Sequence, residues 1–153
     1  MKGKIFAINI APDKKASKIQ VSSGNLIKDI GLEGDAYNKP LNRQISLIST
    51  ELISEQAECP RTGAEPEFIV KPGSFKETLT TEGIDLSKIN IGDIFKIGNS
   101  VKIRISEKGM TCWEFCPWNK PEGECPLPKH FLFAQVIESG TIKSGDSISK
   151  YLI

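Results

Sequence analysis

The chain has 153 residues, of which 39% are hydrophobic and 25% charged, and its formal net charge is +1. This composition is typical of one globular domain, here residues 1–153, and excludes a disordered chain and, because no apolar run reaches about 18 residues, a membrane-spanning one. A nearly neutral chain also lacks the basic excess that phosphate-backbone binding requires, so we expect no nucleic acid and no membrane as partners.

The first half of the chain alternates short strands with turns. Isoleucine-rich alternation predicts strands over residues 4–10 and 15–22, and two glycines mark residues 27–35 as a turn-rich connection. A strand over residues 44–49 is followed by a short helix over residues 50–57, which an acidic residue in the first turn favours. The N-terminal apolar run is too short for a signal peptide, so we expect a cytoplasmic, reducing location.

The second half continues this pattern of short strands. Residues 71–83 predict an ordered loop with a short strand, and residues 107–129 predict an irregular loop. Gly98 and Asn99 predict a two-residue hairpin turn, and Gly140 lies in another predicted turn. Further strands are predicted over residues 68–70, 93–97, 100–105, 131–138 and 146–152.

The sum of these elements predicts a mostly β fold. Many short strands with one clear helical signal indicate a closed or strongly curved β-barrel with one or two short helices, closed by its C-terminal strands. The segment I-N-I-G-D-I-F at 89–95 is echoed by I-K-S-G-D-S-I at 142–148. We interpret this echo as repeated turn chemistry rather than as a duplicated function.

The clearest chemical pattern begins at Gly109. The chain there reads G-M-T-C-W-E-F-C-P-W and then G-E-C-P-L-P, and it holds three of the four cysteines and both tryptophans. Packing gives no reason to gather thiols and tryptophans in one proline-rich loop, whereas sulfur or metal chemistry does.

This stretch resembles the MOSC family, named for the C-terminal domain of molybdenum cofactor sulfurases. Small members carry G-[K/R]-x-C, a second C, G-x-C-x-x-P and a pattern like F-x-x-V-x-x-x-G-x-I-x-x-G-D, which residues 109–146 fit. Two upstream blocks fit in the same order: G-L-E-G-D-A-Y with R-Q-I-S-L-I within 31–48, and K-P-G-S-F-K-E-T-L-T-T-E-G-I-D-L at 71–86. The resemblance covers most of the chain and implies a β-barrel linked to the molybdenum cofactor.

Cys112 is the candidate catalytic residue and the candidate molybdenum ligand. It closely follows Lys108 and Gly109, where a sharp turn and nearby positive charge would lower the thiol pKa and favour the thiolate. The alternative is a buried, apolar cysteine. The resemblance favours the functional interpretation, because the cysteine after G-[K/R]-x in MOSC proteins is the one tied to sulfur or molybdenum.

Cys116 and Cys125 are secondary thiols with several open interpretations. Their spacing is poor for a zinc site, whose fourth ligand would have to be Cys59 or His130, so we expect no zinc. They could instead form a reversible disulfide with Cys112 or pack the loop. The neighbouring aromatic residues either anchor the loop in the core, which we favour, or form a stacking wall for a planar ring such as a pterin; they are Trp113, Phe115 and Trp118.

The candidate cofactor-binding set combines a guanidinium with a polar loop. Arg43 suits bidentate phosphate or carboxylate binding, the alternative being a surface arginine paired with Glu33 or Asp35. The loop after Lys71 offers backbone N–H groups and hydroxyls to an anion. The members of this set are Arg43, Gln44, Ser74, Lys76, Thr80, Thr81 and Lys108. Of these, we expect Arg43, Ser74, Lys76 and Thr81 to line one concave surface with Cys112.

The chain departs from the family pattern at several positions. Tyr37, Asn42 and Trp113 stand where many members have histidine, Met110 replaces a Lys or Arg, and Thr78 replaces an Asn. If those histidines are catalytic in relatives, a specific enzymatic activity is in doubt here. A sulfur-carrier role is affected less, since it needs mainly a thiol and a pocket.

The sequence therefore predicts a molybdenum cofactor-related sulfur carrier or cofactor-binding protein that acts through Cys112, as a persulfide or as a metal-ligating thiolate, with sulfurtransferase activity as its enzymatic form. The resemblance implies the molybdenum cofactor (molybdopterin) as ligand and a cysteine desulfurase, or a molybdenum cofactor biosynthesis or acceptor protein, as partner. Pyridoxal phosphate is a family association and is expected on the partner. The alternative is a non-catalytic binding or adaptor module with a structural or redox-sensitive cysteine loop.

Overall fold

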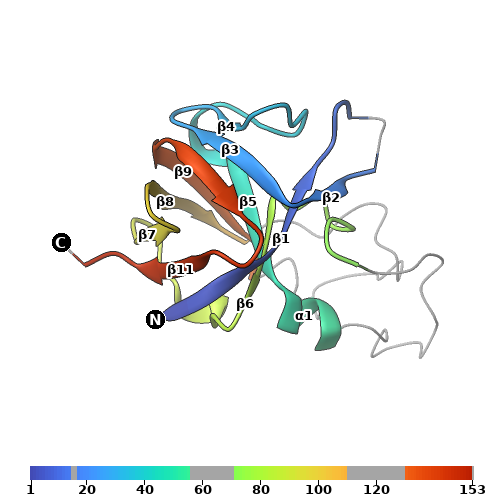
Figure 1. Cartoon of the computed structure of the whole chain (residues 1–153). Coiled ribbons are helices and arrows are strands. Elements are labelled where there is room, and N and C mark those ends of the chain that lie inside the picture. The colour runs from blue at the N-terminus through green and yellow to red at the C-terminus, as the bar shows by residue number, and fades with distance from the viewer. Residues whose placement is uncertain (15–16, 56–70, 110–129, 153) are drawn as a thin grey trace.

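The computed structural model describes residues 1–14, 17–55, 71–109 and 130–152, which fold mostly into β-strands (Figure 1). Seven strands of these residues close into a barrel, because β11 pairs with both β7 and β1. Around the barrel they are β1 (Lys2–Ile10), β6 (Leu79–Glu82), β5 (Ile45–Ser49), β9 (Leu132–Glu138), β8 (Val101–Lys108), β7 (Ile94–Ile97) and β11 (Ser147–Lys150). Neighbours are antiparallel except β5 and β6, which run parallel.

Smaller elements surround the barrel. β2 (Ile19–Val21) adds to the end of β1, and a three-stranded sheet joins β10 (Gly140–Lys143), β3 (Ser23–Ile27) and β4 (Gly31–Leu32). The helices are α1 (Thr50–Glu55) and the 3₁₀ turns η1 (Leu41–Arg43) and η2 (Leu86–Lys88). None of the helices in the described ranges is long and apolar enough to span a bilayer.

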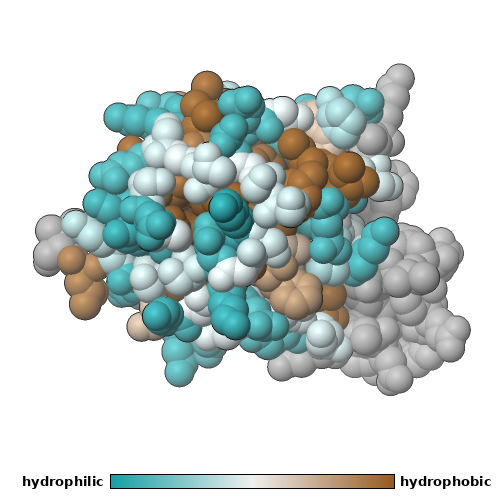
Figure 2. All heavy atoms as spheres, in the orientation of Figure 1, coloured by the Kyte–Doolittle hydropathy of each residue, from teal (hydrophilic) through white to brown (hydrophobic). Residues whose placement is uncertain are grey.

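Alternation along the strands builds the core. On β8, Val101, Ile103 and Ile105 are buried, whereas Lys102 is half-buried and Arg104 is exposed. Period-two alternation of this kind places one face of each strand inside the barrel. Most of the face shown in Figure 2 is hydrophilic or neutral, with a hydrophobic area over the β1–β2 region, where Ile19 is exposed.

The predicted fold class is confirmed. The strands expected over 4–10, 44–49, 93–97, 100–105 and 131–138 correspond to β1, β5, β7, β8 and β9, and the short strand of the 71–83 loop is β6. The C-terminal prediction is confirmed in β11, which closes the barrel on β1. The helix expected from residue 50 is α1, and the strand expected over 68–70 lies outside the described residues.

Five local predictions were wrong. The turn between β7 and β8 has three residues, because Ile97 pairs with Val101 and Gly98 adopts a φ of 59°. The segment expected as a strand over 15–22 forms only the short β2. The connection expected over 27–35 contains the last residue of β3 and all of β4. Gly140 begins β10 instead of lying in a turn, since it pairs with Leu26. Residues 107–108 continue β8 rather than opening the irregular loop.

The I-x-x-G-D echo is repeated turn chemistry, as expected. The Asp93 carboxylate accepts a hydrogen bond from the Asn90 backbone N–H at 2.9 Å, and Asp146 accepts the equivalent bond from Lys143 at 2.8 Å. The glycine before each aspartate has a φ near the left-handed region, 95° at Gly92 and 93° at Gly145. These matching turns lead into β7 and β11, which pair with each other.

Candidate functional site

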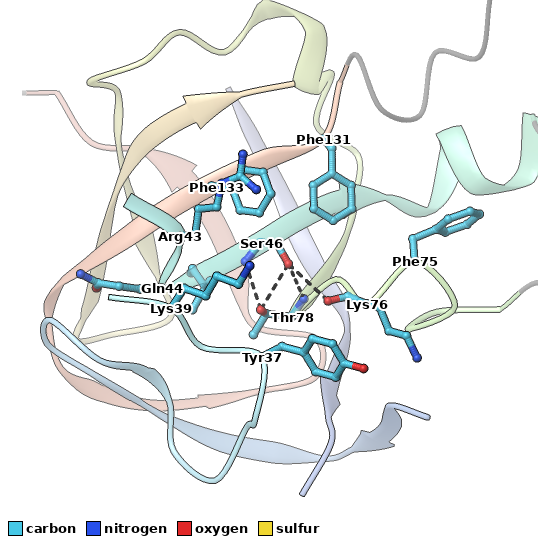
Figure 3. Close-up of a pocket in the computed structure, with 11 residues that line it drawn as sticks. Tyr37, Lys39, Arg43, Gln44, Ser46, Phe75, Lys76, Thr78, Phe131 and Phe133 are labelled. Carbon is cyan, nitrogen blue, oxygen red and sulfur yellow. Dashed lines mark hydrogen bonds between the residues drawn. The ribbon is translucent and has the colours of Figure 1, made fainter. Parts of the chain in front are cut away.

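A pocket of about 210 Å³ lies where η1, the start of β9 and the segment before β6 meet (Figure 3). Figure 3 shows Arg43 beside Phe133 on one side, Tyr37 on the opposite side, and Ser46 and Thr78 between them. Its described lining residues are Tyr37, Lys39, Arg43, Gln44, Ile45, Ser46, Phe75, Lys76, Thr78, Phe131 and Phe133. Three of these side chains are cationic, four are aromatic and none is a carboxylate.

The floor of the pocket is held by a reciprocal pair of side chains. The Ser46 backbone N–H donates to the Thr78 hydroxyl at 3.0 Å, and the Thr78 backbone N–H donates to the Ser46 hydroxyl at 3.1 Å. Both residues are buried. This pair fixes the segment before β6 against β5 although the two residues are far apart in sequence.

Arg43 lies at the end of η1 and forms one wall. Its Nε donates to Oε2 of Glu107 at 2.7 Å, and its guanidinium carbon lies 4.3 Å from the ring centroid of Phe133. The alternative prediction, that Arg43 pairs with Glu33 or Asp35, is therefore wrong. The Arg43 side chain lines the pocket and remains 40% exposed, so solvent or a ligand can reach it.

Gln44 connects the pocket wall to the barrel. Its side-chain amide donates to the Leu41 carbonyl at 3.0 Å, and its side-chain oxygen accepts from the Val136 backbone N–H at 2.9 Å. Leu41 has a φ of 65°, an unfavourable left-handed conformation for a residue with a Cβ. These bonds hold that strained turn against β9, and so set the position of Arg43.

The segment over 73–77 wraps around the buried carboxylate of Glu77. Its Oε2 accepts from the Gly73 backbone N–H at 2.9 Å and from the Thr80 hydroxyl at 2.8 Å, and its Oε1 accepts from the Phe75 backbone N–H at 3.2 Å. Burial raises the pKa of Glu77 above its usual value, while these hydrogen bonds oppose the rise. The wrapped segment presents Phe75 and Lys76 at the pocket.

A second buried charge cluster lies close to the pocket. Lys18 Nζ is 2.9 Å from Asp35 Oδ2, and both side chains are fully buried. Asp35 also accepts from the Ala11 backbone N–H at 3.0 Å. Burial lowers the pKa of Lys18, whereas the attraction of Asp35 opposes that change. The ammonium groups of Lys18 and Lys76 lie 5.2 and 5.6 Å from the Tyr37 ring centroid. The buried Lys18–Asp35 pair therefore lies behind Tyr37, which lines the pocket.

The structure brings together Arg43, Gln44 and Lys76 of the predicted cofactor-binding set. The other described members are absent from the lining. The Ser74 hydroxyl accepts from the Lys71 N–H at 3.0 Å, and Thr80 is buried against Glu77. Thr81 is also buried, and Lys108 donates to the carbonyls of Ser87 and Ile89 at 2.8 Å each. Their predicted roles remain predictions.

The predicted thiol chemistry lies outside the described residues, which include none of Cys59, Cys112, Cys116 and Cys125. His130, considered as a fourth zinc ligand, lines a different hollow with Asp85 and Ser87. No group of three or more His, Cys, Asp or Glu side chains within residues 1–14, 17–55, 71–109 and 130–152 is arranged to hold a metal ion.

Sequence reasoning missed the buried charges. Glu77 lies in the K-P-G-S-F-K-E-T block, and its only signal was an acidic residue two positions before a strand. Lys18 and Asp35 carried no such signal, because their pairing joins two loop positions that only the tertiary fold brings together.

Comparison with known proteins identifies the relatives of this chain. It matches the MOSC domain family over residues 35–149. It is 28% identical over 118 residues to Protein YiiM of Escherichia coli (strain K12). That alignment covers 73% of this chain and 50% of YiiM, so the chain spans about half the length of that curated relative.

Solved structures share the fold at low sequence identity. The YuaD protein from Bacillus subtilis superposes with a TM-score of 0.73 at 18% identity, covering 99% of this chain and 98% of that one. YiiM from Escherichia coli gives 0.67 at 22% identity, covering 100% and 71%. YiiM from Geobacillus stearothermophilus gives 0.70 at 18% identity, covering 98% and 75%.

Proposed function

We propose that this chain, which belongs to the MOSC domain family, binds or sulfurates a molybdenum-containing species at this pocket through Cys112. One observation carries the proposal: the cationic and aromatic pocket borders the point where the cysteine-rich segment leaves and rejoins the barrel. The Gly109 backbone N–H donates to the Phe131 carbonyl at 2.7 Å, and Phe131 lines the pocket.

The pocket chemistry fits an anionic ligand with a planar ring. Lys39, Arg43 and Lys76 supply positive charge, and guanidinium and ammonium groups bind phosphate oxygens well. Phe131 and Phe133, whose ring centroids lie 5.3 Å apart, offer an apolar aromatic wall. A phosphate-bearing pterin such as molybdopterin has both properties, and when bound it would supply a soft metal centre.

Covalent geometry supports the role of Cys112. Cys112 is three residue steps beyond Gly109 in the chain, and three extended steps span at most about 11 Å. Gly109 is itself bonded to a pocket residue. A thiolate that can reach the edge of a cationic pocket is a suitable soft ligand for molybdenum or an acceptor of sulfur.

As a carrier, Cys112 would receive sulfur from a cysteine desulfurase in the cytoplasm. Its thiolate attacks the terminal sulfur of a persulfide on that partner, a new S–S bond forms on Cys112, and the partner leaves as a thiolate. Pyridoxal phosphate belongs to the partner in this scheme. The histidine positions replaced by Tyr37, Asn42 and Trp113 are not needed for this exchange.

The test compares wild type with Cys112→Ser and, as a matched control, Cys59→Ser. Protein purified anaerobically is analysed for molybdenum and pterin fluorescence, and a parallel sample is incubated with a cysteine desulfurase and free cysteine. We expect cofactor retention, or a mass increment of one sulfur atom, in wild type and Cys59→Ser but not in Cys112→Ser. Neither molybdenum nor persulfide on wild type, or a persulfide that survives Cys112→Ser, would overturn the proposal and favour the adaptor alternative.

A further inference from the structure

We propose that Glu77 is a positioning residue of the pocket: its buried carboxylate anchors the 73–77 segment and thereby holds Lys76 where it can meet an anionic ligand. The inference rests on the proposed function only in treating the pocket as an anion site. The order that Glu77 imposes on Lys76 is a property of the free protein and can be measured without a ligand.

The first support is the direction of the hydrogen bonds. The Glu77 carboxylate accepts from two backbone N–H groups and one hydroxyl, of Gly73, Phe75 and Thr80, at 2.8 to 3.2 Å. All three groups donate, which suits the ionised carboxylate, an acceptor only. A carboxamide of the same shape would place an NH₂ group against at least one of these donors.

The second support is the strained backbone that the carboxylate holds. Lys76 has a φ of 64°, and its backbone N–H donates to the Gly73 carbonyl at 3.0 Å. A left-handed conformation is unfavourable for lysine and persists only where the surroundings impose it. Glu77 binds the residues on both sides of the strained position, Gly73 and Phe75 before it and Thr80 after it, so it is placed to impose this conformation.

The third support is the rigid setting of the anchor. Asn9 Nδ2 donates to the Thr80 hydroxyl at 3.0 Å, which in turn donates to Glu77. A Cβ on Gly73 would lie 3.3 to 3.4 Å from side-chain atoms of Lys18 and Asn9, so the segment is packed closely on β1. Lys18, which is paired with Asp35, also interacts electrostatically with Glu77 and with Lys76.

The geometry also separates this role from that of the lining residues. Glu77 is fully buried and lies outside the pocket lining, whereas Lys76 is exposed at its rim. An effect of Glu77 on ligand binding therefore has to pass through the segment that it holds. Loss of Glu77 should then remove the contribution of Lys76 and leave that of Arg43, which η1 and Glu107 position independently.

The test combines dynamics with a double-mutant cycle. Backbone ¹⁵N relaxation is measured for wild type, Glu77→Gln and the matched control Glu82→Gln, an exposed residue on β6. We expect the order parameter of the Lys76 amide to fall below about 0.6 only in Glu77→Gln. An ordered Lys76 in a folded Glu77→Gln protein would overturn the proposal. Should Glu77→Gln fail to fold, Thr80→Val, which removes one of the three bonds, takes its place.

The binding arm uses pterin-6-carboxylate as a fluorescent planar anion. We expect Glu77→Gln and Lys76→Met each to weaken its binding about tenfold, the loss of one charge-assisted contact. The double variant should be no weaker than Lys76→Met alone, because contacting residues that act together are not additive. Additive losses would show a merely structural role for Glu77. If wild type does not bind the probe, the proposed ligand class fails while the relaxation experiment still decides the role of Glu77.

Discussion

The guanidinium of Arg43 lies over the ring of Phe133 at 4.3 Å, while its Nε is bonded to Glu107 at 2.7 Å. This arrangement uses the planar shape of arginine as well as its charge. It joins η1 to β9 and β8, and it fixes the guanidinium of Arg43 in the wall of the pocket.

Replacing Arg43 with lysine tests whether shape matters beyond charge. Arg43→Lys keeps the positive charge but loses the stacked plane, so we expect pterin-6-carboxylate binding to weaken by about 0.5–2 kcal/mol. Fluorescence titration measures the change. Arg104→Lys, an exposed arginine on β8, is the matched control and should bind as wild type does. Equal affinity of Arg43→Lys and wild type would show that charge alone suffices.

The buried Lys18–Asp35 pair should be strongly coupled. Lys18→Met leaves the Asp35 charge buried without its partner, so we expect the free energy of unfolding to fall by about 3–5 kcal/mol. Adding Asp35→Asn removes that charge and should recover most of the loss. Urea unfolding measures both. Lys88→Met, at an exposed ion pair with Asp85, is the control and should leave stability unchanged within error. A Lys18→Met effect as small as that of the control would contradict this account.

Glu77 should give stability a distinct pH dependence. Because burial raises its folded pKa above 4.5, the folded state holds the proton more tightly than the unfolded chain. Its contribution therefore favours folding below pH 4.5 and is lost as the pH rises through the folded pKa. We expect the free energy of unfolding of Glu77→Gln, relative to wild type, to increase over that window. The change is limited to about 1.4 kcal/mol per pH unit.

Urea unfolding at a series of pH values from 4 upward checks this sign. Glu82→Gln changes an exposed carboxylate, so its free energy of unfolding relative to wild type should not rise with pH over that window. A Glu77→Gln curve that runs parallel to wild type over the whole range would mean that the Glu77 carboxyl titrates alike in both states.

Gly31 should be required for steric reasons as well as for its backbone conformation. It has a φ of 121°, and a Cβ there would lie 2.4 Å from the Gln44 carbonyl oxygen. Gly145, with a φ of 93° and no atom within 4 Å of such a Cβ, separates the two effects. We expect Gly145→Ala to cost about 1 kcal/mol and Gly31→Ala clearly more, with NMR shifts at Gln44. Equal losses would show that strain alone matters at Gly31.

The sequence predicted the barrel because local signals carry it. Isoleucine alternation in β1 and β8 and turn glycines such as Gly98 depend on neighbours in the chain. β10 was missed because its pairing with β3, Gly140 opposite Leu26, is set by tertiary contacts and leaves little local trace.

The site residues could be predicted where family blocks mark them. They could not be predicted where burial determines whether a side chain faces the pocket or bonds within the protein. Arg43 and Lys76 were identified from their blocks and meet at one pocket. Ser74 and Thr80 lie in the same block, yet their hydroxyls bond within the protein, to Lys71 and Glu77. The sequence pattern cannot tell a hydroxyl facing a pocket from one that supports the segment behind it.

The pairing of β1 with β11 has a consequence for how the protein is made. Lys2 lies opposite Ser149, and the barrel has no other contact in the described residues that joins β1 to the β7–β11 side through a strand ladder. During synthesis from the N-terminus, the start of β1 must wait, with its β11-facing edge unpaired, until β11 leaves the ribosome. Ring closure is thus a late, long-range step, and until it occurs the nascent chain presents an open sheet edge to chaperones and to other copies of itself.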